Sequence, residues 1–133
     1  MKIVGYTRIS TDKQDLTKQR YLLLEYAQKQ GWLISKFIES EASTKKSLAI
    51  RKIDQLLTIL EKGDKLLILE LSRLGRNMLE TLNIINTLVE KGIDIIFVRQ
   101  PELSTNTPHS KLLLAIYSYF SESERNYISI RTK

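Results

Sequence analysis

The sequence contains no cysteine, only two prolines, a single histidine and no long apolar run. Without cysteine the chain forms no disulfides and no thiolate metal sites, which is typical of a reducing compartment, and we expect a cytoplasmic protein. No apolar stretch approaches the roughly 20 residues that a membrane-spanning helix needs. The first residues, Met1 to Gly5, lead directly into strand-like sequence without the layout of a signal peptide. We therefore expect neither a membrane segment nor a disulfide scaffold.

The charge of the chain is unbalanced in the positive direction. It has 21 Lys and Arg against 15 Asp and Glu, a formal net charge of +6 and a pI near 9.5. Such a balance favours a polyanionic partner, most simply nucleic acid, although an ordinary protein kept soluble by lysines would show the same excess. The length of 133 residues, 42% of them hydrophobic, suits one compact domain with a continuous core.

The spacing of the apolar residues predicts alternating strands and helices. Strands are expected over residues 2–8, 33–38, 66–69 and 93–98, and helices over 16–30, 50–60, 78–90 and from 110 onward. Each of the first three helices ends next to a glycine, and Asn77 with Glu80 resembles a capping box at the start of the third. Polar loops are expected over 40–47 and over 99–109, which holds both prolines.

This order predicts a three-layer α/β/α fold, with an open, mostly parallel sheet and helices on both faces. In such sheets, ligands bind beyond the carboxyl ends of the strands, at the point where the direction of winding switches. We therefore expect the segments after the first, third and fourth strands to hold the chemistry.

The chain divides into a core over residues 1–109 and the start of a long helix over 110–133. The apolar surface of this helix is too broad for a simple exposed helix. We expect it to pack on its own sheet near its start and on a partner subunit further along; the alternative is a helix buried in the core. Because the helical pattern continues to the last residue, we expect the natural protein to be longer.

Two groups of polar residues follow strands of the predicted sheet. Arg8 and Ser10 end the first strand, and Arg73 and Arg76 follow the third. If the sheet winds as predicted, both groups face one crevice, and Ser10 lies among three guanidinium groups. Each guanidinium offers a rigid fork of donors that fits phosphate oxygens and would stabilise charge developing on a phosphodiester under attack. Ser10 is then the candidate nucleophile, once its hydroxyl is activated.

Two further observations bear on this site. Arg73 and Arg76 lie near an expected helix start, where a cation is unfavourable against the helix dipole, so a bound anion would explain their placement. The lone His109 and the lack of an acidic cluster at metal-ligand spacing argue against two-metal nuclease chemistry. Each residue also has an ordinary explanation, since a serine after a strand is usually a turn or cap residue and Gly75 could be a turn glycine. The combination is more specific than its parts.

The combination resembles the catalytic domain of the small serine recombinases, the resolvases and DNA invertases. The resemblance covers nearly the whole chain and rests on Tyr6-Thr7-Arg8-Ile9-Ser10-Thr11 with Gln14 and Gln19, on Ser72-Arg73-Leu74-Gly75-Arg76, and on Glu124-Arg125 with Arg131-Thr132. It implies that Ser10 attacks a phosphate of double-stranded DNA, which gives a 5′-phosphoserine link and a free 3′-hydroxyl. Homodimers would assemble into a tetramer for strand exchange and religation, with no metal or other cofactor.

The resemblance also implies roles for other residues. Phosphate binding would fall to Arg8, Arg73 and Arg76, and support to Gln14 and Gln19. Arg125 and Arg131 would meet backbone phosphates, which supply affinity but no sequence reading. The C-terminal helix-turn-helix domain that such recombinases use to recognise their sites is absent from this sequence.

The chain departs from the family pattern at three positions. Ser72 stands where many relatives carry an aspartate proposed for proton transfer, so Ser72 or water would have to serve. The arginine that relatives carry after the second strand aligns with Ile50, and we assign its role to the neighbouring Arg51. Ile130 replaces the acidic residue that usually precedes Arg131. None of these differences touches the nucleophile.

Two other functions fit parts of the sequence. The first is a catalytically inert, DNA-associated oligomerisation module of the same fold, with cleavage lost alongside the missing carboxylate. The second is a small nucleotide- or phosphate-binding α/β protein. The second is the weaker of the two, because the chain has neither a Gly-x-Gly-x-x-Gly nor a Gly-x4-Gly-Lys loop.

Overall fold

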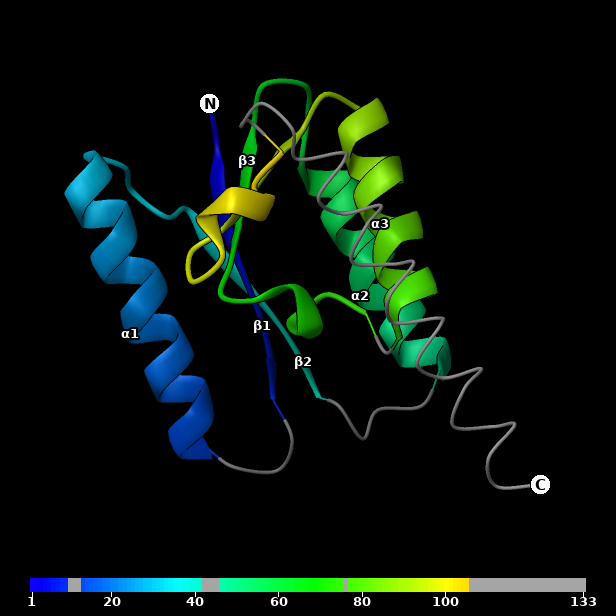
Figure 1. Ribbon diagram of the computed structural model, residues 1–133, viewed down its shortest axis with the longest axis horizontal. Helices are drawn as coiled ribbons and strands as arrows, with labels where there is room; N and C mark the ends of the chain where they lie inside the picture. Colours follow the sequence, from blue (N-terminus) through cyan, green and yellow to red (C-terminus); the bar gives the residue numbers. More distant parts are fainter. Residues whose placement is uncertain (10–12, 42–45, 76, 106–133) are drawn as a thin grey trace.

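A computed structural model of the protein describes residues 1–9, 13–41, 46–75 and 77–105 (Figure 1). Its elements in chain order are β1 (Ile3–Ile9), α1 (Lys13–Gln30), β2 (Lys36–Glu41), α2 (Lys46–Ile59), β3 (Lys65–Ile68), α3 (Met78–Glu90) and β4 (Asp94–Phe97). Two short 3-10 helices, η1 (Leu71–Arg73) and η2 (Pro101–Leu103), follow β3 and β4. The predicted alternation of strands and helices is confirmed up to β4. The long helix expected from residue 110 lies outside the described residues.

The four strands form one parallel sheet in the order β2-β1-β3-β4. After β1, the chain adds β2 on one side, returns across β1, and adds β3 and then β4 on the other side. The direction of winding therefore reverses between β1 and β3, which pair directly from Ile3↔Lys65 to Tyr6↔Ile68. The carboxyl ends of these two strands are neighbours, and this is the position where open parallel sheets bind ligands.

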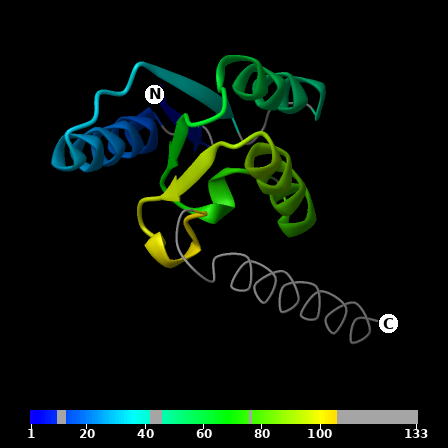
Figure 2. The ribbon, with the colours of Figure 1, turned by 90° about the horizontal axis from the view of Figure 1, so that it is seen from above.

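Helices cover both faces of the sheet, as Figure 2 shows in projection from above. On one face, Leu23 and Ala27 of α1 pack against Ile3, Leu67 and Ile96. On the other face lies the larger cluster. Its buried members on α2 and α3 are Leu56, Ile84, Ile85 and Leu88, with Leu60 directly after α2, and its members on the strands include Val4, Leu66, Ile68 and Phe97. Successive residues of β3 thus alternate between the two clusters, as side chains of a strand must. The expected three-layer α/β/α fold is confirmed.

Several boundaries differ from the sequence-based expectation. Helix α1 begins at Lys13, before the first apolar residue of its stripe, because a polar first turn leaves no trace in apolar periodicity. Helix α2 begins at Lys46, ahead of the predicted start at residue 50. The strand β2 begins at Lys36 and continues through Ser40 and Glu41, which the sequence assigned to a loop. These two residues pair with the end of β1, so backbone pairing rather than apolar pattern sets the limit of β2. Within the ranges described, no helix has the length and apolarity needed to cross a membrane.

The start of β3 is fixed by the carboxylate of Asp64, a residue that is 5% exposed. Its Oδ1 accepts a hydrogen bond from the main-chain N–H of Lys2 at 2.8 Å, and its Oδ2 accepts one from Glu61 at 2.8 Å. The ammonium of Lys2 lies 3.7 Å from the same carboxylate. These interactions, with the Lys2 N–H first among them, lower the pKa of Asp64 against the opposing effect of burial. The carboxylate joins the edges of β1 and β3 at their amino ends.

We expect Asp64→Asn to lower the free energy of unfolding at neutral pH by about 2 kcal/mol, because an amide cannot accept both backbone hydrogen bonds. A folded pKa below the ordinary value of 3.8 means that the carboxylate stabilises the fold above that pH. The stabilisation is lost as the pH falls through the lower, folded pKa. Urea denaturation of both proteins along a falling pH series should therefore show the difference shrinking below 3.8. The exposed Asp54→Asn is the matched control, and a difference independent of pH would contradict the assignment.

Candidate active site

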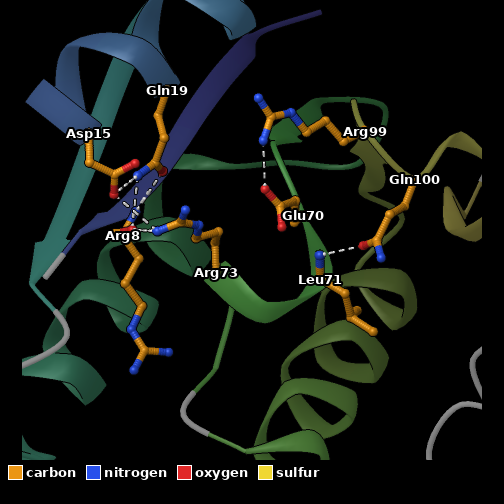
Figure 3. Close-up of polar contacts among 8 residues, drawn as sticks. All are labelled: Arg8, Asp15, Gln19, Glu70, Leu71, Arg73, Arg99 and Gln100. Carbon is orange, nitrogen blue, oxygen red and sulfur yellow. Dashed lines mark hydrogen bonds and ion pairs between the residues drawn. The ribbon is translucent and has the colours of Figure 1, made fainter.

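The candidate site lies where β1 and β3 end, and Figure 3 shows the polar side chains around it. Arg8 is the penultimate residue of β1, and its Nη1 donates a hydrogen bond to the carbonyl oxygen of Gly75. The side chain of Arg8 therefore joins the end of β1 to the segment between η1 and α3. Ser10 directly follows β1 in the sequence, and Arg76 directly follows Gly75, but both lie outside the described residues.

Arg73, on η1 after β3, also reaches the end of β1. Its Nη1 donates to the main-chain oxygen of Arg8 at 3.0 Å and to Oδ2 of Asp15 at 3.1 Å. Figure 3 shows Arg73 reaching toward Asp15 and Gln19, while the side chain of Arg8 extends away from that cluster. The fold thus brings Arg73 to the backbone of Arg8, as the sheet topology predicts, but the two guanidinium groups engage different partners.

Gln19, which is 1% exposed, ties this arrangement together. Its Oε1 accepts from the main-chain N–H of Arg8 at 3.3 Å, and its Nε2 donates to the main-chain oxygen of Arg8 at 3.1 Å. The same Nε2 lies 2.9 Å from Oδ2 of Asp15. The buried amide therefore bonds both peptide groups of a residue that stands two positions before Ser10. Gln19 therefore holds the backbone at the end of β1.

Arg73 does not lie near the start of an α-helix, contrary to the prediction from the sequence. Arg73 is the last residue of η1, whereas α3 begins at Met78 behind the N-cap Asn77. The side chain of Arg73 is held by the acceptors on α1 and β1 described above, so no bound anion is required to explain its place. The capping interaction expected at Asn77 is confirmed, since its Oδ1 accepts from the N–H of Glu80 at 2.8 Å.

Gly75 is required by a close approach to α3. A Cβ atom on Gly75 would lie 2.5 Å from Oγ1 of Thr81 and 2.8 Å from its main-chain nitrogen. Gly75 is not among the glycines with positive φ, so steric room rather than a left-handed turn explains it. The contact seats Gly75 against the first turn of α3, and the carbonyl of Gly75 there accepts the hydrogen bond from Arg8.

The end of β4 adds polar residues to the same edge of the sheet, as the winding predicts. Arg99 Nη1 lies 3.1 Å from Oε1 of Glu70, and Oε1 of Gln100 accepts from the N–H of Leu71 at 2.7 Å. Sequence reasoning pointed to this segment without naming the residues. It missed Asp15 entirely, although an acid in the first turn of a helix just after the candidate nucleophile was the available signal.

Tyr6 lies behind the site on β1 and is 3% exposed. Burial raises the pKa of its phenol, and this effect outweighs the side-chain hydrogen bond with Ser40 and the nearby charge of Arg8, which lower it. The phenol therefore stays protonated under ordinary conditions and cannot serve as an anionic base. Its pairing with Ser40 links β1 to β2 near their carboxyl ends.

The structure describes the remaining predicted site residues to different extents. Gln14 and Ser72 are exposed, in the first turn of α1 and in η1. Arg51 lies on α2, and only its backbone is described. Arg125 and Arg131 lie outside the described residues, together with Ser10 and Arg76. Among the residues described, no group of three or more His, Asp or Glu is placed to hold a metal ion.

Comparison with known proteins gives consistent matches over almost the whole chain. The family model described as "Resolvase, N terminal domain" matches residues 3–133. A resolvase of Clostridium perfringens (strain 13 / Type A) is 34% identical over 133 residues, covering 98% of this chain and 68% of that protein. A DNA-invertase of Escherichia phage P1 is 29% identical, covering 98% and 66%. The chain thus spans about two thirds of the length of these relatives.

Solved structures agree with these matches. The N-terminal catalytic domain of TP901-1 integrase superposes with a TM-score of 0.71 at 25% identity, over 96% of this chain and 98% of that one. A resolvase family site-specific recombinase from Streptococcus pneumoniae superposes with a TM-score of 0.70 at 23% identity, over 99% and 93%. The second likeness supports the fold alone.

Proposed function

This chain belongs to the resolvase family, as the catalytic domain of a site-specific recombinase, and we propose that it cleaves DNA with Ser10 as the nucleophile. The observation that carries the proposal is the meeting of β1 and β3 at the reversal of winding. There Arg73 bonds the main chain of Arg8, two residues before Ser10. These two arginines are 65 positions apart in the sequence, and we propose that Ser10 acts beside them.

The reaction would exchange one phosphodiester for another. The Ser10 oxygen forms a bond to phosphorus as its hydroxyl proton leaves to a base, and the bond from phosphorus to the 3′-oxygen breaks. The 3′-oxygen takes up a proton, and the 5′-phosphate stays linked to serine. Because the new ester is similar in energy to the old one, the reverse attack by a 3′-hydroxyl rejoins the strands without a nucleotide or metal cofactor.

Arg8, Arg73 and Arg76 would supply the electrostatic part of catalysis. The negative charge on the phosphoryl oxygens grows as a fifth oxygen approaches phosphorus, and preorganised donors stabilise that charge. Arginine suits this task because it stays charged and presents its donors as a planar fork. The positive charge of the chain, +6 in total, favours its approach to the DNA backbone. We extend the proposal to Gln14, Arg51, Ser72, Arg125 and Arg131 as residues that support the site or contact phosphates.

Each chain contributes one Ser10, whereas exchange between two duplexes requires four strands to be cut. We therefore propose that the protein acts as a homodimer that assembles into a tetramer on DNA, through the helix expected over residues 110–133. The cytoplasmic location expected from the sequence belongs to the same proposal, because the protein must reach DNA.

Covalent trapping tests the proposal. The full-length protein that carries this chain is allowed to select a duplex from a random-sequence library. That duplex is rebuilt with a nick beside the cleaved phosphate, so that the short product strand diffuses away and the intermediate accumulates. We expect a protein–DNA adduct on a denaturing gel, and mass spectrometry of its proteolytic fragments should place the 5′-phosphate on the peptide with Ser10. A selected duplex that yields no adduct would favour the inert oligomerisation module instead.

A further inference from the structure

We infer that Asp15 is a positioning residue for strand cleavage: its carboxylate holds the guanidinium of Arg73 so that the other donors of that side chain face the DNA phosphate. The inference rests on the proposed function and goes beyond it, because Asp15 belongs to no motif on which the resemblance depends. The structure assigns the role through contacts of this carboxylate with two partners.

Asp15 lies in the first turn of α1 and bridges that helix to η1. One oxygen, Oδ2, accepts from Nε2 of Gln19 at 2.9 Å and from Nη1 of Arg73 at 3.1 Å. Among the described residues, Asp15 is the acid whose carboxylate pairs with Arg73. An acid in the first turn of a helix is favourable by itself, but that alone would not aim the side chain at a cation 58 positions later.

The carboxylate has an anchor of its own, independent of Arg73. Gln19 is buried and bonds both peptide groups of Arg8, so its Nε2 holds Asp15 at a fixed place relative to the end of β1. Support therefore runs from the backbone of Arg8 through Gln19 and Asp15 to Arg73. A catalytic group held through such a chain loses little freedom when substrate binds, which is the condition for fast chemistry.

Within the part of the chain that the structure describes, the geometry leaves donors of Arg73 for a substrate. Arginine carries five N–H donors, and the two bonds of Nη1 go to Asp15 and to the carbonyl of Arg8. The donors on Nη2 and Nε are not used by these two bonds and lie on the other edge of the guanidinium fork. Fixing one edge of the fork orients the other edge, which is the one that a phosphate would meet.

The burial of the ion pair indicates how strongly Asp15 holds Arg73. The side chains of Arg73 and Asp15 are 28% and 25% exposed, so water screens this pair less than a pair on the open surface. In this proposal the carboxylate lies near the incoming phosphate, and the repulsion between the two negative charges weakens DNA binding. A variant without the charge should therefore bind DNA as well or better while it cleaves more slowly.

The test compares Asp15→Asn with the unchanged full-length protein on the nicked duplex described above. Asparagine keeps the shape and the Gln19 contact but loses the charge that holds Arg73. We expect adduct formation at saturating protein to slow about 10- to 100-fold, the scale of a misplaced catalytic group. The affinity for the duplex, measured by titration, should stay the same or increase, because a negative charge beside the phosphate is removed. Asp54→Asn, an exposed change on α2, is the matched control.

A double-mutant cycle separates positioning from a general effect on folding. In an Arg73→Ala background, Asp15→Asn should change the cleavage rate little, because the side chain that it positions is gone. The inference is overturned if Asp15→Asn cleaves as fast as the unchanged protein or faster, or if it costs the same factor without Arg73. Thermal unfolding is recorded for each protein, and Asp15→Ser replaces the asparagine variant if that variant unfolds. Absence of an adduct from the unchanged protein would instead contradict the proposed function.

Discussion

A Ser10→Ala variant of the full-length protein is expected to form no covalent adduct with the nicked duplex, while it still binds that duplex. Alanine removes the oxygen that we propose attacks phosphorus and leaves the proposed phosphate-binding arginines unchanged. The affinity comes mainly from contacts between basic side chains and backbone phosphates, and these contacts do not involve the serine hydroxyl. Denaturing gels for the adduct and titration of labelled duplex for the affinity measure the two quantities separately.

The matched control for this variant is Ser72→Ala. Ser72 is an exposed serine on η1 beside Arg73. Because we propose that it only supports the site, its loss should slow adduct formation without abolishing the adduct. An adduct that survives Ser10→Ala would show that another group attacks the DNA. An adduct lost in both variants would assign Ser72 a part in the proton transfer for which the chain lacks the carboxylate of many relatives.

Arg8→Ala and Arg73→Ala are each expected to slow cleavage by about 100- to 1000-fold, the usual effect of removing one preorganised donor from a charge that develops in the transition state. Duplex affinity should fall far less, because each arginine is one of many basic groups that can meet phosphates. Single-turnover adduct formation at saturating protein measures the first effect, and duplex titration the second. We expect the same pattern for Arg76→Ala.

The arginine series has two internal checks. Arg73→Lys keeps the charge but loses the fork that lets one side chain bond Arg8, Asp15 and a phosphate together, so its rate should stay well below that of the unchanged protein. Arg99→Ala removes an arginine from the same edge of the sheet, where it pairs with Glu70 at 3.1 Å, and should have little effect. If each alanine change lowers cleavage and affinity by the same factor, the arginines only position DNA.

The fold could be predicted because its strongest signals are local. The apolar run after Lys65 is typical of a strand buried on both faces of a parallel sheet. The glycines at positions 31, 63 and 92 marked the ends of elements and have positive φ. Right-handed crossovers then limit how such a chain can wind. The apolar pattern did not predict the start of α2 at Lys46 or the extension of β2 to Glu41. Both of these end residues are polar, and polar residues at the end of a helix or strand add nothing to apolar periodicity.

The candidate site was predictable in its location and less so in its contacts. Topology alone brings the segment of Arg73 to the end of β1. The partner of Arg73 is Asp15, however, and this contact depends on the rotation of α1 against the sheet, which no spacing in the sequence specifies. Gly75 is a second contact that the sequence did not predict, because the atoms of Thr81 that leave no space for a Cβ at position 75 lie on another element. The order of the elements can be predicted from the sequence, whereas side-chain contacts between elements can be identified only from the structure.

The way Gln19 recognises its neighbour has a consequence for how this protein can change. The amide of Gln19 bonds only the main-chain N–H and carbonyl oxygen of residue 8, which every amino acid except proline offers. These hydrogen bonds therefore do not depend on the side chain at position 8. Substitutions at that position can therefore be compared on an unaltered frame. Evolution can likewise exchange the side chain at position 8 while Gln19 keeps the end of β1 in place.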